Sequence, residues 1–548
     1  MINIAMIIFS ILFGMIFSYK PICCVIKSQN KKAEFFEHKN QFILSGITII
    51  GCLFRTVCLG SLPAGLNQDE ASIGYEAFSL AYYGIDRNGL SFPVHFISWG
   101  SGQNALYAYI LIPFIKIFGL TTFSLRLPMA LLGCVSIYVF YYLLKIILPK
   151  YAILGTFFFA INPWHIEKSR WALEANIFPD LFLIALLLFM LAINGKKIYY
   201  VLSGIVFGLA TYSYGTSYFV LPVFAVAVLA ILLLQKKIKL SESVIFLGTI
   251  FIVSLPMIIF VLLNYSEYES VTFLGVTIPK LYQNRQTSIL NTDGAFFTSL
   301  FANIKTIFEI LFVQYDGLAW NGMKFFGLTY VITTPLMIWG VIKSIRDKNE
   351  NELPMQMWLA SSVAMLLFIE ANINRANILF IPMIYFTIRG VASLLDLAKR
   401  KSTIKSAKVL TACVMSILFV AFGFSYFGET HQTAVSYQFF DGAGEAMVYA
   451  DENYDAVYVT STINEPYITY LFYTQISPYE YLETREVSNP NEAFEYISQI
   501  GNFTFWDIAP EDLNEGECYI CCVSSISEYD LQDYNVETFE NFVIISKK

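Results

Sequence analysis

A series of long apolar stretches between residues 2 and 427 constrains the fold of this chain more than any other feature. Stretches of about 18 or more apolar residues mark membrane helices, and soluble domains have roughly 25% charged residues. Here 56% of the residues are hydrophobic and only 14% are charged. The chain is therefore expected to be a mainly α polytopic membrane protein. The expected spans are 2–26, 41–60, 124–147, 151–164, 177–194, 198–214, 217–235, 243–263, 328–345, 355–370, 376–395 and 409–427.

The basic residues between these spans predict the topology. Lys and Arg gather in six connecting segments, which the positive-inside rule places in the cytoplasm. They share one side only if the intervening spans come in pairs. Segment 104–120 breaks that parity, is short, and contains Pro113 and Lys116, so it is predicted to be an interfacial or re-entrant helix. The six segments contain Lys27, Lys31, Lys32 and Lys39; Lys145 and Lys150; Lys196 and Lys197; Lys236, Lys237 and Lys239; Lys343, Arg346 and Lys348; and Lys399, Arg400, Lys401, Lys405 and Lys408.

Charge also divides the chain into two bodies. Residues 428–548 contain 22 acidic and 3 basic residues, a net charge of −19, whereas residues 1–427 have a net charge of +12. The acidic tail alternates short β-rich runs with helix-like stretches, which predicts a small α/β domain on the extracytoplasmic side. We expect a membrane domain at 1–427 and an acidic extracytoplasmic domain at 428–548. No basic patch indicates binding to nucleic acid.

The nine cysteines give no disulfide framework. Cys518, Cys521 and Cys522 form a C-x-x-C-C sequence in the tail. A zinc site needs about four ligands, and no second pair or His is near. Buried strand cysteines are therefore favoured over a metal or redox site, and no metal or cofactor is expected.

The carboxylate pair Asp69–Glu70 indicates chemistry most directly. It lies in the first outer loop, where a carboxylate in a partly desolvated site can act as a general base on a bound hydroxyl, amine or phosphate. The alternative is structural, because acids also favour the first turn of a helix, here ASIGYEAFSLAYYG. The two interpretations can hold together.

A second polar cluster lies at 161–180, in INPWHIEKSRWALEANIFPD. Cations beside tryptophans at the outer membrane face suit binding of a lipid phosphate and stacking of a sugar ring. The alternative is an aromatic belt with snorkelling basic side chains. The candidate binding residues here and in other outer segments are Arg126, Trp164, His165, Arg170, Lys280, Arg285 and Arg375, and Arg55 is a further candidate because a charge inside a span is costly.

Several motifs resemble a known family. The first outer loop reads P-x-G-L-x-x-DE-A-x-x-x-Y-x-A and then G-x-D-x-x-G-x-x-x-P. Together with FSLRLPMALLG, NPWHIEKSRWALEAN and NRANILFIPMIYF, it resembles the glycosyltransferase family 39 and ArnT-like group of the GT-C superfamily, related to protein mannosyltransferases, over about residues 41–395. The span at 2–26 and the acidic tail have no counterpart in that pattern.

The resemblance implies a GT-C-like catalytic domain of about 12 transmembrane helices, with amphipathic helices in the first outer loop. It further implies transfer of a sugar from a polyprenyl-phosphate carrier to a lipid, glycan or protein acceptor at the outer face of the cell membrane. Transfer would be inverting and independent of metal, with Asp69 as base, Glu70 beside it, and Glu174 as a second acidic residue. Such chemistry needs a base for the acceptor and cations for the departing phosphate.

A membrane transporter or flippase for a lipid-linked or polar substrate is the alternative function. Transporters tend to place ionisable residues in mid-span and to contain repeated halves. Here the charges gather at one face and no repeat is evident, which favours the enzyme.

Overall fold

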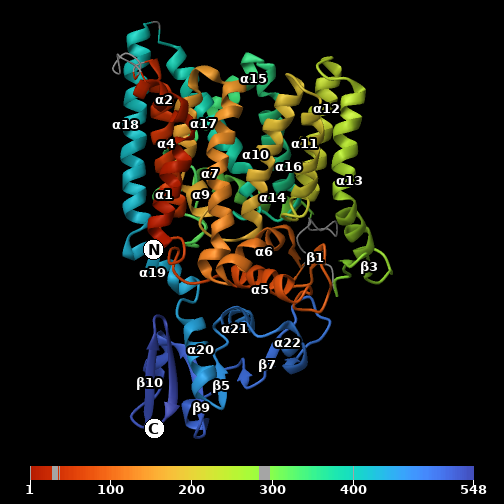
Figure 1. The fold of residues 1–548 in the computed structure, drawn as a ribbon, viewed down its shortest axis with the longest axis vertical. Helices are drawn as coiled ribbons and strands as arrows, with labels where there is room; N and C mark the ends of the chain where they lie inside the picture. The colour runs from red at the N-terminus through yellow and green to blue at the C-terminus, as the bar shows by residue number, and fades with distance from the viewer. Residues whose placement is uncertain (1, 28–34, 36, 101, 283–295, 399) are drawn as a thin grey trace.

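The computed structural model describes residues 2–27, 35, 37–100, 102–282, 296–398 and 400–548. A bundle of long helices forms one end of the molecule, and a small domain built on a β-sheet forms the other (Figure 1). Between them lies the segment that the sequence predicts to be the first outer loop, which includes α5 and α6; below, the outer end of the bundle means the end beside this segment. The prediction of a mainly helical membrane body with a small α/β domain is confirmed.

A helix lies at each segment that the sequence predicts to span the membrane. Within the described residues, seven helical segments are long and apolar enough to cross a bilayer. They are α1 to α2 (Ile2–Lys27), α7 (Thr122–Ile147), α10 (Glu174–Ile193), α12 (Ser217–Leu234), α13 (Leu240–Asn264), α17 (Asn377–Asp396) and α18 (Lys401–Tyr426). The others are shorter or less apolar: α4 (Lys39–Thr56), α8 (Ala152–Ala160), α11 (Ile198–Ala210), α15 (Thr334–Asp347) and α16 (Leu353–Phe368).

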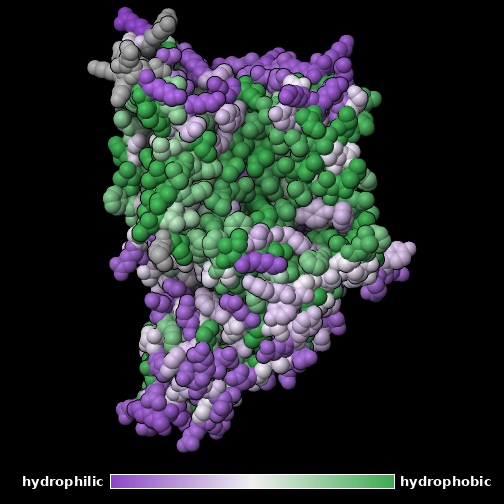
Figure 2. Space-filling view, viewed as in Figure 1, coloured by the Kyte–Doolittle hydropathy of each residue, from purple (hydrophilic) through white to green (hydrophobic). Residues whose placement is uncertain are grey.

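The surface of the bundle matches this assignment. Apolar residues form a broad band around it, and hydrophilic residues gather at its far end and over the tail (Figure 2). The ends of the band correspond to the two membrane surfaces, because a bilayer core of about 30 Å can cover only apolar side chains.

The first outer segment lies across the end of the bundle. It comprises α5 (Gln68–Tyr82), a two-stranded ladder of β1 (His95–Phe96) and β2 (Gln103–Asn104), and α6 (Leu106–Phe118) (Figure 1). A helix as long as α6 extends about 20 Å, too short for the roughly 30 Å hydrocarbon core. The interfacial position predicted for segment 104–120 agrees with this arrangement.

The long outer loop contains structure that the sequence interpretation left out. A hairpin of β3 (Val271–Phe273) and β4 (Val276–Ile278) follows α13. A 17-residue helix, α14 (Phe296–Phe312), then returns to the bundle, where the side chain of Asn303 donates to the carbonyls of Leu367 and Ile369 at the end of α16. The short helix α9 (Pro163–Lys168) lies between α8 and α10.

The tail folds as a mixed α/β domain. Its seven strands follow the order β10-β11-β9-β5-β8-β7-β6, and β5 pairs in parallel with both β8 and β9. Cys518 and Cys521 are buried in β9, as the strand interpretation predicted, whereas Cys522 at the end of the strand is half-buried. All nine cysteines are free. The elements are α19 (Glu429–Gln438), α20 (Ala443–Asn453), β5 (Ala456–Val459), α21 (Pro466–Thr474), α22 (Pro478–Thr484), β6 (Arg485–Val487), β7 (Ile497–Ile500), β8 (Phe503–Thr504), β9 (Glu517–Cys522), β10 (Tyr534–Phe539) and β11 (Phe542–Lys547).

The tail is packed closely against the first outer segment. Gly74 on α5 faces the ring of Phe472 on α21, and a Cβ at Gly74 would lie 2.8 Å from that ring. Nearby, the Tyr75 hydroxyl donates to the carbonyl of Ile476 over 2.8 Å. This contact brings residues of the tail next to the segment that contains Asp69.

Candidate active site

Asp69 and Glu70 occupy the first turn of α5. The side chain of Asn67 accepts a hydrogen bond from the Asp69 backbone N–H over 2.9 Å and so caps the helix. Successive residues of a helix point about 100° apart, so the two carboxylates leave the helix in different directions. Their surroundings differ accordingly.

Glu70 is part of a buried ion pair. Its two oxygens accept from Nε and Nη2 of Arg126 over 2.9 and 2.8 Å, and one of them also accepts from the Ala172 N–H over 2.6 Å. The guanidinium of Arg126 also donates hydrogen bonds to the carbonyls of Pro63 (2.7 Å) and Gly65 (2.8 Å). Both side chains are completely buried. The pair therefore connects α5, α7 and the segment before α10, and Arg126 has no donor directed at solvent.

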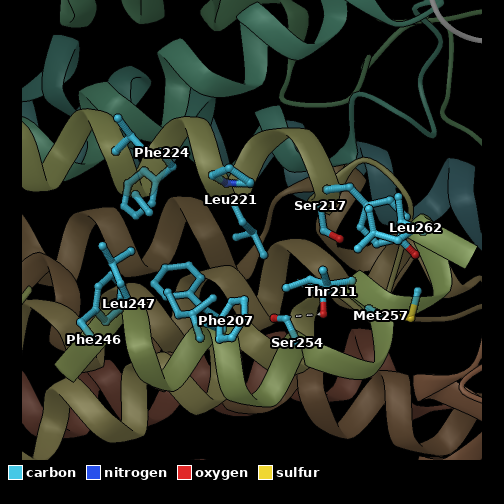
Figure 3. Close-up of a pocket in the computed structure, with 18 residues that line it drawn as sticks. Phe207, Thr211, Ser217, Leu221, Phe224, Phe246, Leu247, Ser254, Met257 and Leu262 are labelled. Carbon is cyan, nitrogen blue, oxygen red and sulfur yellow. Dashed lines mark hydrogen bonds between the residues drawn. The ribbon is translucent and has the colours of Figure 1, made fainter. Parts of the chain in front are cut away.

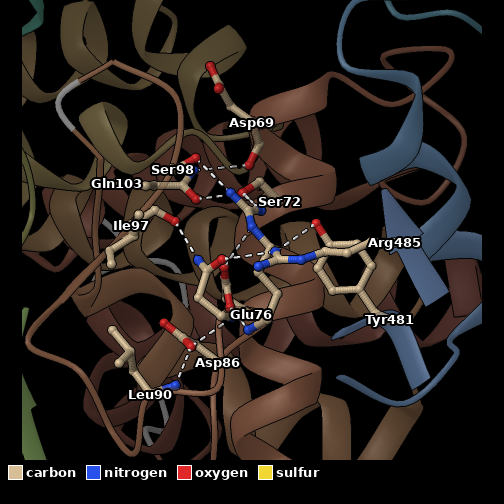
Figure 4. Close-up of polar contacts among 12 residues, drawn as sticks. Asp69, Ser72, Glu76, Asp86, Leu90, Ile97, Ser98, Gln103, Tyr481 and Arg485 are labelled. Carbon is tan, nitrogen blue, oxygen red and sulfur yellow. Dashed lines mark hydrogen bonds and ion pairs between the residues drawn. The ribbon is translucent and has the colours of Figure 1, made fainter. Parts of the chain in front are cut away.

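Asp69 remains partly accessible. Burial raises the pKa of its carboxyl to about 6, a hydrogen bond with the side chain of Trp99 opposes that rise, and the charge of Glu70 adds to it. Gln103 donates from Nε2 to the Asp69 carbonyl over 3.3 Å. In Figure 4 the Asp69 carboxylate points away from the ion-pair network below it. A carboxyl with this pKa is ionised at neutral pH and still basic enough to accept a proton.

Glu174, at the outer end of α10, is the second carboxylate of the site. Its Oε2 accepts from the backbone N–H of Asn104 over 2.7 Å, and it lies close enough to Asp69 for the two charges to interact. Gln103 and Asn104 are neighbours on β2, so this short strand contacts both acids. The structure thus brings together Asp69 and Glu174, which are 105 positions apart in the sequence.

Arg87 is the centre of a polar network that contacts α5 through Glu76 and Ser72. The sequence interpretation missed this network. Arg87 pairs with Glu76, whose Oε1 lies 3.3 Å from its Nε, and donates to the hydroxyls of Ser72 and Ser98 over 2.7 Å each (Figure 4). Ser72 in turn donates to Oε1 of Gln103 over 2.9 Å. The one signal for this network is the G-x-D-x-x-G motif that contains Arg87, which gives no indication of its partner.

His165 and Trp164 lie in the interior of the membrane body. Arg55 donates to Nδ1 of His165 over 2.7 Å, so the proton of the imidazole is on Nε2, which donates to Asp180 over 3.0 Å. The Trp164 indole donates to Oδ1 of Asn377 over 2.9 Å. All these side chains are buried, so their contacts connect helices.

Arg170 caps the C-terminal end of α4 with hydrogen bonds to backbone carbonyls. Its Nη1 donates to the carbonyl of Phe54 over 2.8 Å, and its Nη2 donates to the carbonyls of Val57 (2.8 Å) and Leu62 (3.0 Å). A guanidinium is well suited to the free carbonyls at a helix C-terminus. Arg170 is fully buried in this position.

Two of the other predicted cations lie at the ends of helices. Lys280 donates to the carbonyl of Leu263 over 2.9 Å at the outer end of α13. Arg375 pairs with Glu370 over 2.8 Å and lies two residues before the start of α17. Arg285 lies outside the described residues. Neither Lys280 nor Arg375 is fully buried.

Glu167 and Lys168 form a separate buried pair on α9. Lys168 donates to Oδ1 of Asn321 over 2.9 Å, and burial lowers its pKa to about 7. Burial raises the pKa of Glu167 to about 8, and neither of its oxygens has a hydrogen-bond partner among the described residues.

An apolar groove of about 510 Å³ lies between α11, α12 and α13 (Figure 3). Most of its lining is aliphatic or aromatic, and a few hydroxyl groups gather at one end. One of these, Tyr218, accepts from Nδ2 of Asn104 over 3.0 Å, and Asn104 also binds Glu174. Two residues, Tyr218 and Asn104, therefore connect the polar end of the groove to Glu174. Its hydroxyl-bearing residues are Thr211, Ser217, Tyr218 and Ser254.

Among the residues that the structure describes, no group of three or more His, Cys, Asp and Glu side chains is arranged to hold a metal ion.

The fold is similar to that of the solved structures of ArnT. ArnT from Cupriavidus metallidurans bound to undecaprenyl phosphate aligns with a TM-score of 0.51 at 10% identity, over 92% of this chain and 97% of that one. The same protein in the apo state gives a TM-score of 0.50 with the same identity and coverage. An oligosaccharyltransferase, AglB from Archaeoglobus fulgidus, aligns at 14% identity over 76% of this chain, with a TM-score of 0.43. This chain spans only 58% of that protein.

A sequence family agrees with the fold. Residues 104–262 match the family model described as dolichyl-phosphate-mannose-protein mannosyltransferase. No curated protein sequence matched the chain. The partial family match and the ArnT-like fold agree with the resemblance found in the sequence.

Proposed function

We propose that this protein transfers a sugar from a polyprenyl-phosphate donor to an acceptor at the extracytoplasmic face, with Asp69 as the general base. The observation that carries the proposal is the connection between the apolar groove and Glu174 through Tyr218 and Asn104, because Glu174 lies close enough to Asp69 for their charges to interact. A polyprenyl chain needs an apolar groove that opens to lipid, and its phosphate needs a polar group where the groove ends. The ArnT structure with undecaprenyl phosphate supports this donor class.

The proposed reaction is a single displacement. The acceptor hydroxyl gives its proton to the Asp69 carboxylate, and its oxygen forms a bond to C1 of the sugar. The bond between C1 and the phosphate oxygen breaks at the same time, and its electron pair leaves with the polyprenyl phosphate. Attack opposite the leaving group inverts the configuration at C1. Glu174, with one oxygen held by Asn104, uses the other to orient a hydroxyl of the sugar or the acceptor.

The remaining roles follow from which donors are free. Glu70 and Arg126 satisfy each other, so we assign them to positioning the start of α5. Arg170, His165 and Trp164 hold helices together in the same way. For the departing phosphate we favour the hydroxyls at the polar end of the groove. Lys280 donates to the carbonyls of Leu263 and Ser266, so it remains a candidate binding residue with committed donors. Arg285 and Arg375 remain candidate binding residues.

The experiment compares the parent protein with Asp69→Asn in lipid nanodiscs with labelled polyprenyl-phosphate sugars. We expect Asp69→Asn to lower the transfer rate by about 10²- to 10⁴-fold, the usual contribution of a general base. Because the base must be ionised, the parent rate should fall about tenfold per pH unit below the Asp69 pKa of about 6. Asp530→Asn, an exposed carboxylate in the tail, is the matched control.

An Asp69→Asn variant as fast as the parent would show that another group is the base. A parent that transfers no sugar, yet moves a labelled substrate across sealed vesicles, would favour the transporter alternative.

A further inference from the structure

The hairpin of β3 and β4 has an apolar face that the described residues leave largely exposed. Residues that pair across an antiparallel ladder share a face, and this face consists of Val271, Phe273, Val276 and Ile278. Ile278 packs at the base of the hairpin against the apolar cluster of Val94, Met257, Phe260 and Leu281. The other three residues of the face are between 43% and 72% exposed. The opposite face consists of Thr272 and Thr277, whose hydroxyls share a hydrogen bond over 3.0 Å.

Leu274, at the tip, is the residue of the hairpin that the fold explains least. Together with Gly275 it forms the two-residue turn, and the φ angles of these two residues are +51° and +79°. Turns of this kind favour Asn, Asp or Gly at the first position, because a Cβ makes a positive φ unfavourable. Leu274 nevertheless occupies that position and is 87% exposed. A large apolar residue in an unfavourable conformation, buried by no described residue, indicates an apolar environment outside the protein.

The hairpin lies where the lipid-facing surface of α13 ends. The exposed side of α13 includes Ile252, at 71%, and Leu262, at 65%. Residues 265–270 connect α13 to β3, and in this connection Tyr265 and Tyr268 are 67% and 77% exposed. Tyrosines are enriched at the level of the lipid headgroups. The hairpin projects sideways from the outer end of α13, beyond the outline of the bundle (Figure 1). The bilayer surface at that end of the bundle therefore reaches the hairpin tip.

The base of the hairpin is joined to the first outer segment. The backbone N–H of Thr277 donates to the carbonyl of Ser91 over 3.1 Å, and its carbonyl accepts from the N–H of Val94 over 2.9 Å. The Ser91 hydroxyl also donates to the carbonyl of Gly275 over 2.9 Å. A tip held in the membrane therefore fixes the height of the segment that contains Asp69.

The charges beside the hairpin favour contact through apolar side chains. Glu267 and Glu269 are exposed in the connection before β3. Lys280, which follows β4, donates to the carbonyl of Leu263 at the end of α13. Acidic side chains are repelled by anionic headgroups, so attraction between charges does not bring this hairpin to the bilayer.

We propose that the tip of the β3–β4 hairpin inserts into the outer leaflet, where Phe273, Leu274 and Val276 contact headgroups and the first part of the acyl chains. The inserted tip anchors the first outer segment to the membrane surface. This interaction goes beyond the proposed function, since it does not depend on the reaction at Asp69 and holds equally for a transporter.

The test measures the depth of a spin label at Val276→Cys in the full chain, reconstituted in nanodiscs of phosphatidylcholine. Collisions of the label with oxygen, which concentrates in the bilayer, are compared with collisions with a water-soluble nickel chelate. Labels at Ile252→Cys on α13 and at Ser524→Cys in the tail are the lipid and water references. Oxygen collisions should dominate at Val276, as at Ile252, and nickel collisions should dominate at Ser524. The background replaces with Ser the cysteines that are not buried: Cys23, Cys24, Cys58, Cys413 and Cys522.

A second variant removes the apolar tip and keeps the turn. Phe273→Ser combined with Leu274→Asn leaves Asn-Gly, the pair that such turns prefer. The collision ratio of the label at Val276 should then shift to that of the water reference, while the melting temperature stays at the parent value.

Four results would overturn the proposal. The first is a label at Val276 that matches the water reference in the parent chain, and the second is a label that stays in lipid when the tip is removed. The third is low accessibility to both reagents, which would show that protein covers the tip. The fourth is insertion only in nanodiscs that contain anionic lipid, which would show attraction to headgroup charge instead of insertion of the apolar face.

Discussion

At the scale of single residues, Asp69 and Glu70 show how adjacent identical charges acquire different roles. Both begin α5, but the helix directs one into an enclosed contact with Arg126 and leaves the other partly accessible beside Trp99. A buried carboxylate with a bidentate guanidinium partner is fixed in place and has no free oxygen for a reactant. Only Asp69 retains the freedom that a base requires.

This difference predicts opposite effects for neutral isosteres at the two positions. Glu70→Gln leaves the Arg126 charge buried without its partner, which should lower the free energy of unfolding by about 3–5 kcal/mol. Asp69→Asn removes a carboxyl that burial disfavours in its charged form, so it should not lower stability. Thermal unfolding of both variants in the same detergent provides the measurement. Equal melting temperatures for Glu70→Gln and the parent would contradict the structural role of the pair.

The sequence singled out Asp69 directly and Glu174 through the family resemblance, and the structure brings these two carboxylates near each other, while their catalytic roles stay predictions. The sequence could not show which cations were free. Arg170 donates to carbonyls at the end of α4 and Lys280 to a carbonyl at the end of α13, and backbone partners leave no trace in side-chain patterns. Arg87 was missed for a related reason, since its partner Glu76 lies on a helix whose orientation depends on tertiary packing.

At the scale of helices and strands, hydropathy predicted the bundle and the short interfacial helix α6 but missed the amphipathic helix α14. Long apolar helices are recognisable because every face meets lipid or protein. The helix α14 was overlooked since only one of its faces packs on the bundle, and its polar residues gave the segment the appearance of a loop. The groove was not predictable, because it depends on the spacing between α11, α12 and α13.

The groove predicts that KM depends on the length of the lipid chain of the donor. Ala225 on α12 lines it, so Ala225→Phe should occupy space that the polyprenyl chain needs. Excluding about two methylene groups costs about 1.6 kcal/mol, which should raise KM for a long-chain donor by roughly tenfold. A donor with a ten-carbon chain should be affected less. Ile252→Phe, an exposed position on α13 outside the groove, controls for the added ring.

An equal rise in KM for the short and long donors would exclude the groove as the site of the lipid chain. Melting temperatures of the two phenylalanine variants distinguish a blocked groove from a disturbed bundle.

At the scale of the whole molecule, charge separated the chain into two bodies but gave no indication of how they meet. The contact depends on close approach at particular residues, such as Gly74 against Phe472 and Gly65, at φ +79°, against Phe439. Such steric fits are visible only in three dimensions. They hold the tail against the segment that contains Asp69, so the tail and Asp69 lie on the same side of the membrane.

That topology predicts which side of the membrane each end of the bundle faces. Ser524 is exposed in the tail, whereas Cys24 is exposed near the end of α2, which lies at the opposite end of the bundle (Figure 1). In a background with Cys23, Cys24, Cys58, Cys413 and Cys522 replaced by Ser, the added Ser524→Cys should react with an impermeant maleimide in sealed right-side-out vesicles. A matched background that retains only Cys24 of these five should react after permeabilisation alone. The reverse pattern would place Asp69 in the cytoplasm, where nucleotide sugars are available, and a lipid-linked donor would no longer be required.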